Sequence, residues 1–183
     1  YPTNDTDIEI LYRVNNLSAT YWSLVFGTND KTNYFDFRTV PSGPHPASGI
    51  FRFHKGLYAD SELTVPIDTA IHLLKLDGRT LYYDGVLVGS VPETTFQILR
   101  ALMLFTSNGS GNTPFGQFTD MTIFYCKIWE SGVLVNDFMP IAAGEKAPNN
   151  QTAPSNCFYE KVSQTFYQNA RIGSPNSFIM DYA

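Results

Sequence analysis

The sequence predicts an all-β protein folded as a two-sheet antiparallel sandwich. Apolar and polar residues alternate along most of its 183 residues, whereas apolar residues at helical spacing are nearly absent. Short apolar runs are separated by turn sequences rich in Gly, Pro, Asn and Asp. Asp-Gly occurs between such runs, where it is typical of a tight hairpin. Many short strands joined by such turns are characteristic of a sandwich.

The first predicted strand is Ile8–Val14, whose apolar residues alternate with mostly charged neighbours. This pattern predicts one buried face made of Ile8, Ile10, Tyr12 and Val14. The further predicted strands are Tyr21–Phe26, Tyr34–Arg38, Gly49–His54, Ala70–Leu76, Thr80–Tyr83, Val86–Ser90, Thr95–Leu99, Leu102–Thr106, Met121–Trp129, Val133–Phe138, Phe158–Val162 and Thr165–Tyr167.

Two Asp-Gly pairs, Asp77-Gly78 and Asp84-Gly85, lie between apolar runs. Asp-Gly accepts the positive φ angles of a type I′ turn, so this region predicts a three-stranded meander. The polar stretches Pro41–Ser48 and Gly144–Ser155 predict long surface loops within one domain. We expect a single domain over residues 1–183 that is a segment of a larger chain.

The composition excludes several classes of protein. With 43% hydrophobic and 15% aromatic residues the chain is neither disordered nor a coiled coil. A net charge of -5 and the lack of any Lys/Arg cluster argue against a nucleic-acid partner. No apolar run approaches the ~20 residues of a membrane-spanning helix, so membrane insertion is not expected.

The two cysteines, Cys126 and Cys157, are too few for a disulfide scaffold and lack metal-ligand spacing. Both lie in apolar, strand-like sequence, where a free buried thiol is common. We expect both thiols to be reduced and buried. A single bridge between them stays open as the alternative.

Three segments resemble a known family. HLLKLDGRTLYYDGVLVGS (His72–Ser90) is similar to the central hairpins of concanavalin A-like, laminin G-like jelly-roll domains. MTIFYCKIWESGVLVNDFMPI (Met121–Ile141) and NCFYEKVSQTFYQNARIGSPNSF (Asn156–Phe178) resemble one branch of that superfamily, found in phage tail or virion proteins and in bacterial surface proteins. The chain departs from the branch at Asn136, where Arg is usual, and at Glu160, where Asp is usual.

The resemblance implies a jelly-roll sandwich and a place on a virion or cell surface, outside the cell. It implies a cell-surface glycan or polysaccharide as ligand, with homo-oligomers or other fibre subunits as further partners. A non-catalytic carbohydrate-binding or host-recognition (adhesion) module is the favoured function. A purely structural virion or assembly module is the alternative, and a glycoside hydrolase is the third class.

The acidic residues do not predict catalysis. Glycosidases share this fold, and Asp5, Asp7 and Glu9 alternate along one strand. A retaining pair needs two carboxyls ~5–5.5 Å apart, one of them protonated. The spacing of these three residues differs from the Glu-x-Asp-x-x-Glu motif of retaining β-glucanases. They also lie on the first strand instead of in the middle of a sheet. The solvent face of a strand is the simpler interpretation, so we do not expect an enzyme.

No metal or cofactor site is predicted. His45 lies in a Pro-rich loop, His54 ends a strand and His72 begins one, without zinc spacing. Some laminin G-like domains bind calcium through loop carboxylates, and calcium stays an alternative here. Asp77 and Asp84 fit better as turn residues.

The aromatic residues of Met121–Trp129 suggest a ligand surface. The phase of this strand places Thr122, Phe124, Cys126 and Ile128 on the core face and Ile123, Tyr125, Lys127 and Trp129 on the opposite face. Sugar rings stack on aromatic planes, so Tyr125 and Trp129, beside Lys127, are candidate ligand-binding residues. The same alternation groups Arg52 with His54. Packing of these aromatics under loops or against a neighbouring subunit is the competing interpretation.

Polar loops are the second candidate surface. Thr28–Asn33, Pro41–Ser48 and Ser107–Pro114 supply hydrogen-bonding groups and almost no charge, as suits a neutral polyol. Asn108 and Asn112 are the candidate ligand-binding residues in the last of these loops.

Overall fold

The computed structural model describes residues 2–15, 23–30, 32–41, 47–57, 62–92, 95–104, 107–108, 114–115, 117–118 and 121–167. Every regular element in these ranges is a β-strand. None of the described residues forms a helix that could cross a membrane.

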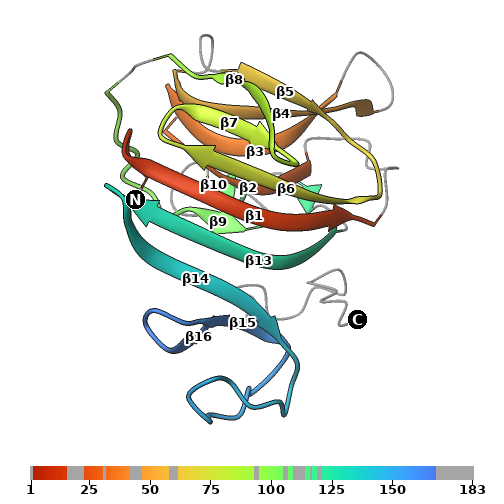
Figure 1. Ribbon diagram of the computed structural model, residues 1–183, viewed down its shortest axis with the longest axis vertical. Coiled ribbons are helices and arrows are strands. Elements are labelled where there is room, and N and C mark those ends of the chain that lie inside the picture. Colours follow the sequence, from red (N-terminus) through yellow and green to blue (C-terminus); the bar gives the residue numbers. More distant parts are fainter. Residues whose placement is uncertain are drawn as a thin grey trace.

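The strands form two sheets that pack face to face (Figure 1). The first sheet contains, in order of hydrogen-bonded neighbours, β16 (Thr165–Tyr167), β15 (Cys157–Glu160), β14 (Val133–Ile141), β13 (Met121–Glu130), β1 (Thr6–Val14), β6 (Ile71–Asp77), β7 (Thr80–Tyr83) and β8 (Val86–Ser90). The second contains β11 (Pro114–Phe115), β10 (Ser107–Asn108), β2 (Ser23–Asn29), β3 (Asn33–Pro41), β4 (Ala47–Leu57) and β5 (Glu62–Pro66). β9 (Met103–Leu104) and β12 (Gln117–Phe118) also pair with β2.

The sandwich predicted from the alternation is therefore confirmed, and the jelly-roll connectivity stays a prediction. β1 lies in the middle of the first sheet, between β13 and β6, although these two strands are far apart in the sequence (Figure 1). Pairing in this sheet is antiparallel throughout, whereas the short strands β10 and β12 run parallel to β2.

The core lies between the sheets. The predicted inward residues of the first strand are fully buried, namely Ile8, Ile10, Tyr12 and Val14. They share one apolar cluster with Phe26, Phe35, Phe37 and Phe53 of the second sheet. The ring of Tyr12 meets that of Phe37 edge to face across the two sheets, with 5.7 Å between centroids. Full burial of such a side chain stabilises the fold by about 1.5–3 kcal/mol, which identifies this layer as the main source of stability.

Two turns have type I′ character, and one of them was predicted to have it. Asp84 and Gly85 have φ angles of 52° and 78° and connect β7 to β8, as expected. Ser131 and Gly132, with φ angles of 49° and 76°, connect β13 to β14 in the same way. Positive φ at both central positions matches the twist of the flanking strands.

The Asp77-Gly78 turn differs from its prediction by one residue. Asp77 pairs with Thr80 inside the ladder, so the two-residue loop is Gly78-Arg79. Gly78 has a φ angle of 61°, and Arg79 does not have positive φ. A hydrogen bond from the Gly78 N–H to Oδ1 of Asp7, 2.8 Å long, holds the turn against β1. This contact comes from a distant strand, which no local pattern reveals.

One predicted strand in the middle of the chain is wrong, and the described part of Leu102–Thr106 is a strand only at β9. Thr95–Leu99 is not a strand, and forms only an isolated bridge between Gln97 and Thr3. Phe96 and Ile98 are nevertheless buried in the core, which explains their alternation with polar residues.

β13 carries an irregularity that the alternation did not predict. Tyr125 pairs with Leu11, but the next pair along β1 is Tyr12 with Ile123, so Phe124 is an extra residue. Such a bulge reverses the facing of every residue beyond it. Ile123 is accordingly buried in the core, and Phe124 is not, which contradicts the predicted phase for these two residues. Cys126 and the residues after it keep the predicted phase.

The two cysteines are free and buried, as predicted. Cys126 belongs to the main core. Cys157 belongs to a second, smaller cluster formed with Ile141, Ala147, Ala153 and Tyr159. Burial raises the pKa of both thiols, because a thiolate is poorly solvated inside the protein.

Candidate functional site

The predicted aromatic residues of β13 lie on the outer face of the first sheet. Lys127 lies opposite Glu9 of β1, and Trp129 lies opposite Asp7. Tyr125 is on the same face, because side chains two residues apart in a strand point the same way. Tyr125, Lys127 and Trp129 are all half-buried. The structure thus brings together the three candidate residues that the sequence grouped on this strand.

Tyr125 is fixed in place by its two neighbours on this face. Its hydroxyl donates a hydrogen bond to Oε1 of Glu9 over 2.9 Å. The ammonium of Lys127 lies over its ring, 5.2 Å from the centroid, which is a cation–π distance. Burial and the bond to Glu9 raise the pKa of Tyr125 to about 12, so the hydroxyl is protonated at neutral pH.

Arg52 and His54 occupy the outer face of the second sheet. They alternate with Phe53, which belongs to the core, so the core separates them from the aromatic residues of β13. His54 is 0% exposed and shares a 2.8 Å hydrogen bond with the buried Asp36. This burial removes His54 from the candidate ligand surface. Arg52 is half-buried.

The polar loops are only partly described. Asn108 contributes its backbone to β10, while its side chain and all of Asn112 lie outside the described residues. Most of Pro41–Ser48 also lies outside them. In the loop Thr28–Asn33, the carboxylate of Asp30 accepts a 2.7 Å hydrogen bond from the Asn33 N–H and so closes the turn.

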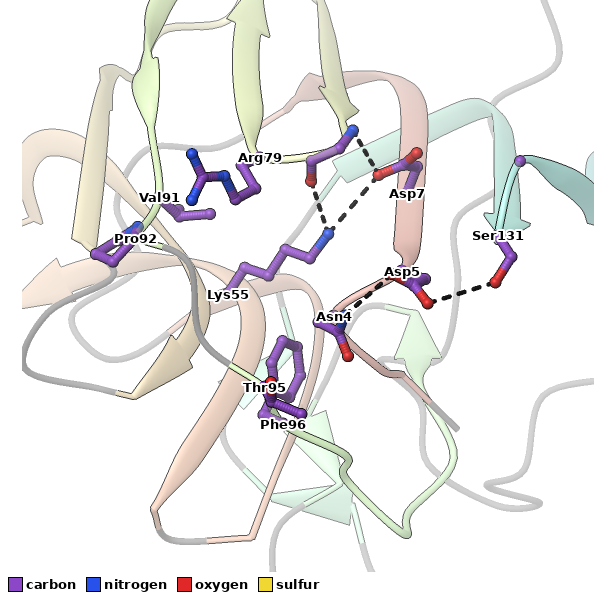
Figure 2. A pocket seen from close by; sticks show the side chains of 12 residues that line it. Asn4, Asp5, Asp7, Lys55, Arg79, Val91, Pro92, Thr95, Phe96 and Ser131 are labelled. Carbon is purple, nitrogen blue, oxygen red and sulfur yellow. Dashed lines mark hydrogen bonds and ion pairs between the residues drawn. The ribbon is translucent and has the colours of Figure 1, made fainter.

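A hollow of about 360 Å³ opens at the rim of the sandwich, where β1 begins (Figure 2). Among the described residues, the polar side chains of its lining are those of Asn4, Asp5, Asp7, Lys55, Arg79, Thr95 and Ser131. Its apolar lining comprises Val91, Pro92 and Phe96. In Figure 2, Arg79 lies on one side of the opening and Asp5 and Ser131 lie on the other, with Lys55 between them. The described lining residues come from five separate parts of the chain.

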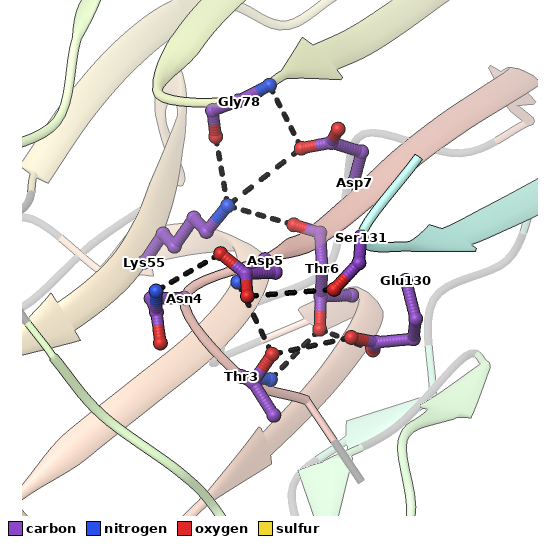
Figure 3. Close-up of polar contacts among 9 residues, drawn as sticks. All are labelled: Thr3, Asn4, Asp5, Thr6, Asp7, Lys55, Gly78, Glu130 and Ser131. Atoms are coloured by element: carbon purple, nitrogen blue, oxygen red, sulfur yellow. Dashed lines mark hydrogen bonds and ion pairs between the residues drawn. The ribbon is translucent and has the colours of Figure 1, made fainter. Parts of the chain in front are cut away.

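Lys55 crosses from the second sheet to the first (Figure 3). It is 2% exposed, and its ammonium donates 2.7 Å hydrogen bonds to the carbonyl oxygens of Thr6 and Gly78. Oδ1 of Asp7 is 3.7 Å from the same nitrogen. Burial lowers the pKa of Lys55, although the nearby carboxylates oppose this shift. The side chain therefore ties β4 to β1 and to the β6–β7 turn.

Asp7 is the partner of Lys55 at the edge of the hollow. Its Oδ1 accepts the bond from Gly78 and faces the ammonium. Burial raises the pKa of Asp7, against the opposite effects of Lys55 and of the Gly78 N–H. The other carboxylate oxygen, Oδ2, accepts no hydrogen bond from any described residue.

A second polar network holds the segment before β1 (Figure 3). Glu130 accepts hydrogen bonds from the hydroxyls of Thr3 and Thr6. Asp5 accepts a 3.0 Å bond from the side-chain amide of Asn4, and its backbone oxygen accepts the Ser131 N–H. These bonds join the start of β1 to the β13–β14 turn, so the wall of the hollow is fixed by the fold.

The carboxylates considered for calcium have other partners. Asp84 accepts from His72 and from the Leu73 N–H, and Asp77 lies 3.3 Å from the ammonium of Lys75. Among the described residues, no group of three or more His, Cys, Asp or Glu side chains could hold a metal ion.

No family model, curated protein or solved structure matches this chain. The resemblance noted in the sequence therefore stays a hypothesis, and the surfaces described above are interpreted from their own residues.

Sequence reasoning missed Lys55, although a signal for it exists. Phe51, Phe53 and Lys55 share one phase of the strand, so a charged residue falls on the core face of β4. A buried charge needs partners, and this predicts a contact with another element. Asp5 and Asp7 were expected to be ordinary solvent-facing residues. The β6–β7 turn that contacts Asp7 is distant in the sequence, so the local pattern does not reveal this contact.

Proposed function

We propose that this chain is a non-catalytic carbohydrate-binding module that acts in adhesion or host recognition at a cell or virion surface. The ligand is a cell-surface glycan or polysaccharide. The observation that carries the proposal is the aromatic row on the outer face of the first sheet, where Glu9 and Lys127 fix Tyr125 four residues before Trp129.

A fixed aromatic ring suits a sugar. The C–H face of a pyranose packs on an aromatic plane, and each such contact contributes about 1 kcal/mol. Since Tyr125 is already held by its neighbours, little side-chain entropy is lost when a ligand stacks on it. Sugar hydroxyls also need donors and acceptors. Lys127 and Lys75, which flank Glu9 on neighbouring strands, supply donors beside the ring, and the Glu9 carboxylate supplies an acceptor.

The partners of the acidic residues support binding without turnover. Glu9 accepts the Tyr125 hydroxyl, and Asp7 faces the Lys55 ammonium and the Gly78 N–H. A glycosidase needs one carboxyl that stays protonated and a second that attacks or activates water. Glu9 and Asp7 each already accept a bond from a donor of the chain itself, whereas the retaining mechanism needs one carboxylate free to attack.

Binding at one such surface is weak. Two aromatic contacts and a few hydrogen bonds correspond to a Kd of ~10⁻³ to 10⁻⁴ M. Adhesion then depends on several copies in one assembly, because linking weak sites multiplies their effective concentration. We infer that the module acts as part of an oligomer or a fibre outside the cell.

One observation favours a structural module as the second candidate. Val133 is 65% exposed and Leu134 is 36% exposed, and Leu134 pairs with Trp129. An apolar strip of this kind also fits a contact with another subunit. In that case the aromatic row is covered in the assembly and no glycan binds it.

A glycan array followed by titration of the isolated chain tests the proposal. We expect Trp129→Ala and Tyr125→Ala each to weaken binding of the best oligosaccharide about fivefold, as removal of one stacking contact of ~1 kcal/mol requires. Tyr167→Ala is the matched control, since Tyr167 is 47% exposed on β16, away from the aromatic row. Equal loss in the control, or no loss in either variant, contradicts this location.

The enzymatic alternative is tested separately. Incubation with β-glucans and bacterial wall polysaccharide is expected to release no reducing ends. Release that is abolished by Asp7→Asn overturns the non-catalytic assignment. Absence of binding to every glycan on the array favours the structural module.

A further inference from the structure

The rim hollow lies beside the aromatic row but is a distinct surface. Asp7 belongs to both, because it pairs with Trp129 across β1 and β13 and also lines the hollow. We propose that the hollow is a second carbohydrate subsite, which takes one neutral sugar ring of the same ligand. This inference rests on the proposed carbohydrate-binding function.

The size of the hollow suits a small ligand. Its volume of about 360 Å³ lies near the lower end of the ~300–1,000 Å³ that ligand pockets occupy. Val91 and Phe96 are buried and form an apolar wall, on which the C–H face of a ring can pack. Polar groups surround this wall, as in sites that orient a ligand by a few hydrogen bonds.

The charges of the lining favour a neutral ligand over an ion. Among the described residues of the lining, the two acidic side chains, Asp5 and Asp7, are matched by two basic ones, Lys55 and Arg79. An anion would meet both carboxylates, and a cation would meet both basic groups. A polyol, which donates and accepts at each hydroxyl, can use both kinds of group.

Two acceptors on opposite sides of Lys55 are available to such a ligand. Oδ2 of Asp7 and Oδ1 of Asn4 accept no hydrogen bond from any part of the chain that the structure describes. Adjacent sugar hydroxyls can donate to them, and the guanidinium of Arg79 can donate to a ring or hydroxyl oxygen. Oxygen acceptors flanked by a guanidinium are suited to the paired hydroxyls of a sugar.

The hollow is also held in shape before any ligand arrives. Lys55 fixes the β6–β7 turn against β1 through its bonds to Thr6 and Gly78. The Ser131 N–H fixes the opposite turn to Asp5. A preformed site loses less entropy on binding, which matters most for a weak ligand.

The test is a titration of the ¹⁵N-labelled chain, followed by amide chemical shifts. The probes are glucose, galactose, mannose and N-acetylglucosamine, each raised to about 20 mM, at which a site with a Kd of ~1 mM is nearly saturated. We expect at least one sugar to shift the amides of Gly78, Ser131 and Gly132. Asp5→Asn, Asn4→Ala and Arg79→Ala are each expected to weaken this binding at least threefold while leaving the spectrum folded.

Matched controls keep the two proposals distinguishable. Lys146→Ala and Asn149→Ala change an exposed and a half-buried residue outside the lining of the hollow, and both are expected to leave the affinity unchanged. Trp129→Ala is expected to spare monosaccharide binding at the hollow while weakening the binding of an oligosaccharide.

Shifts confined to the amides of Tyr125, Lys127 and Trp129 overturn the proposed subsite in the hollow and leave the proposed function standing. Equal shifts with sodium acetate or ammonium chloride identify an ion site and overturn the inference. No shift with any sugar or array glycan overturns both.

Discussion

Nδ1 of His72 lies 2.7 Å from Oδ2 of Asp84, so the start of β6 is bonded to the turn that follows β7. The other ring nitrogen, Nε2, lies 2.7 Å from Oδ1 of Asp68. Carboxylates only accept hydrogen bonds, so both nitrogens donate when both contacts are made, and the ring is then an imidazolium. The ring also stacks on Tyr83, with 4.8 Å between centroids. The charged ring of His72 therefore links the start of β6 to Asp68 before it and to Tyr83 and Asp84 at the end of β7.

This arrangement predicts a pH-dependent stability. Burial by itself lowers the pKa of His72, but the bonds to Asp84 and Asp68 outweigh it and raise the pKa above 6.5. The stabilisation is therefore fully present below 6.5 and is lost as the pH rises through the raised value. We expect the free energy of unfolding in urea to fall across this window in the wild type. The difference between the wild type and His72→Asn should shrink in the same window, and a constant difference contradicts the charged state.

Removal of the Lys55 ammonium is predicted to destabilise the fold strongly. Lys55→Met keeps the length of the side chain but leaves the carbonyls of Thr6 and Gly78 without their donor, and Asp7 without its cation. Each unsatisfied buried group costs about 1–3 kcal/mol, so we expect a loss of ~2–4 kcal/mol in the free energy of unfolding.

Lys75→Met is the matched control for this change. Its ammonium pairs with Asp77 over 3.3 Å, but both side chains are well exposed. An exposed pair contributes about 0–1 kcal/mol, so urea unfolding should hardly change. Equal effects in the two variants would show that the buried bonds of Lys55 contribute little.

The elements with strong alternation were predictable, and the contacts between distant segments were not. Thr80–Tyr83, Val86–Ser90 and Thr165–Tyr167 match their predicted bounds, because tight turns or clear alternation delimit them. Phe124 departs from its predicted face, because a bulge depends on how β1 pairs with β13. Local sequence does not encode that pairing.

The same distinction explains the candidate sites. Tyr125, Lys127 and Trp129 share one strand, so alternation alone groups them on one face. The rim hollow combines Asp7, Lys55 and the β6–β7 turn, which are brought together only by the packing of two sheets. A sequence can flag Lys55 as a charge in a core phase, but it cannot name Thr6 and Gly78 as its partners.

Glu160 is predicted to stabilise the turn between β15 and β16. Its buried carboxylate accepts hydrogen bonds from the N–H groups of Asp137, Val162 and Ser163, at 2.8, 2.9 and 2.6 Å. Glu160→Gln replaces one acceptor oxygen with a donor, which then faces an N–H group. We expect a loss of ~2–3 kcal/mol in the free energy of unfolding, the usual cost of losing hydrogen bonds to a buried charge.

The pH dependence of this contribution has the opposite sign to that of His72. Burial raises the pKa of Glu160, but the hydrogen bonds from Ser163 and the backbone outweigh it and lower the pKa below 4.5. The stabilisation is present above 4.5 and is lost as the pH falls through the lowered value. Glu145→Gln is the control, since Glu145 is exposed and accepts a single N–H bond, from Ala142. A similar loss in both variants contradicts a special role for Glu160.

The thiols are predicted to be unreactive until the protein unfolds. Cys126 is 0% exposed and Cys157 is 1% exposed, and burial raises the pKa of both. The thiolate is the reactive form, so both low access and a raised pKa slow the reaction with a disulfide reagent. We expect slow labelling of the native chain and two equivalents after unfolding in guanidinium. Ala70→Cys, at an exposed position, should add one fast equivalent and proves that the reagent is active. An intact mass lower than that of the reduced chain by two hydrogen atoms, with no labelling after unfolding, would instead reveal a bridge between the two cysteines.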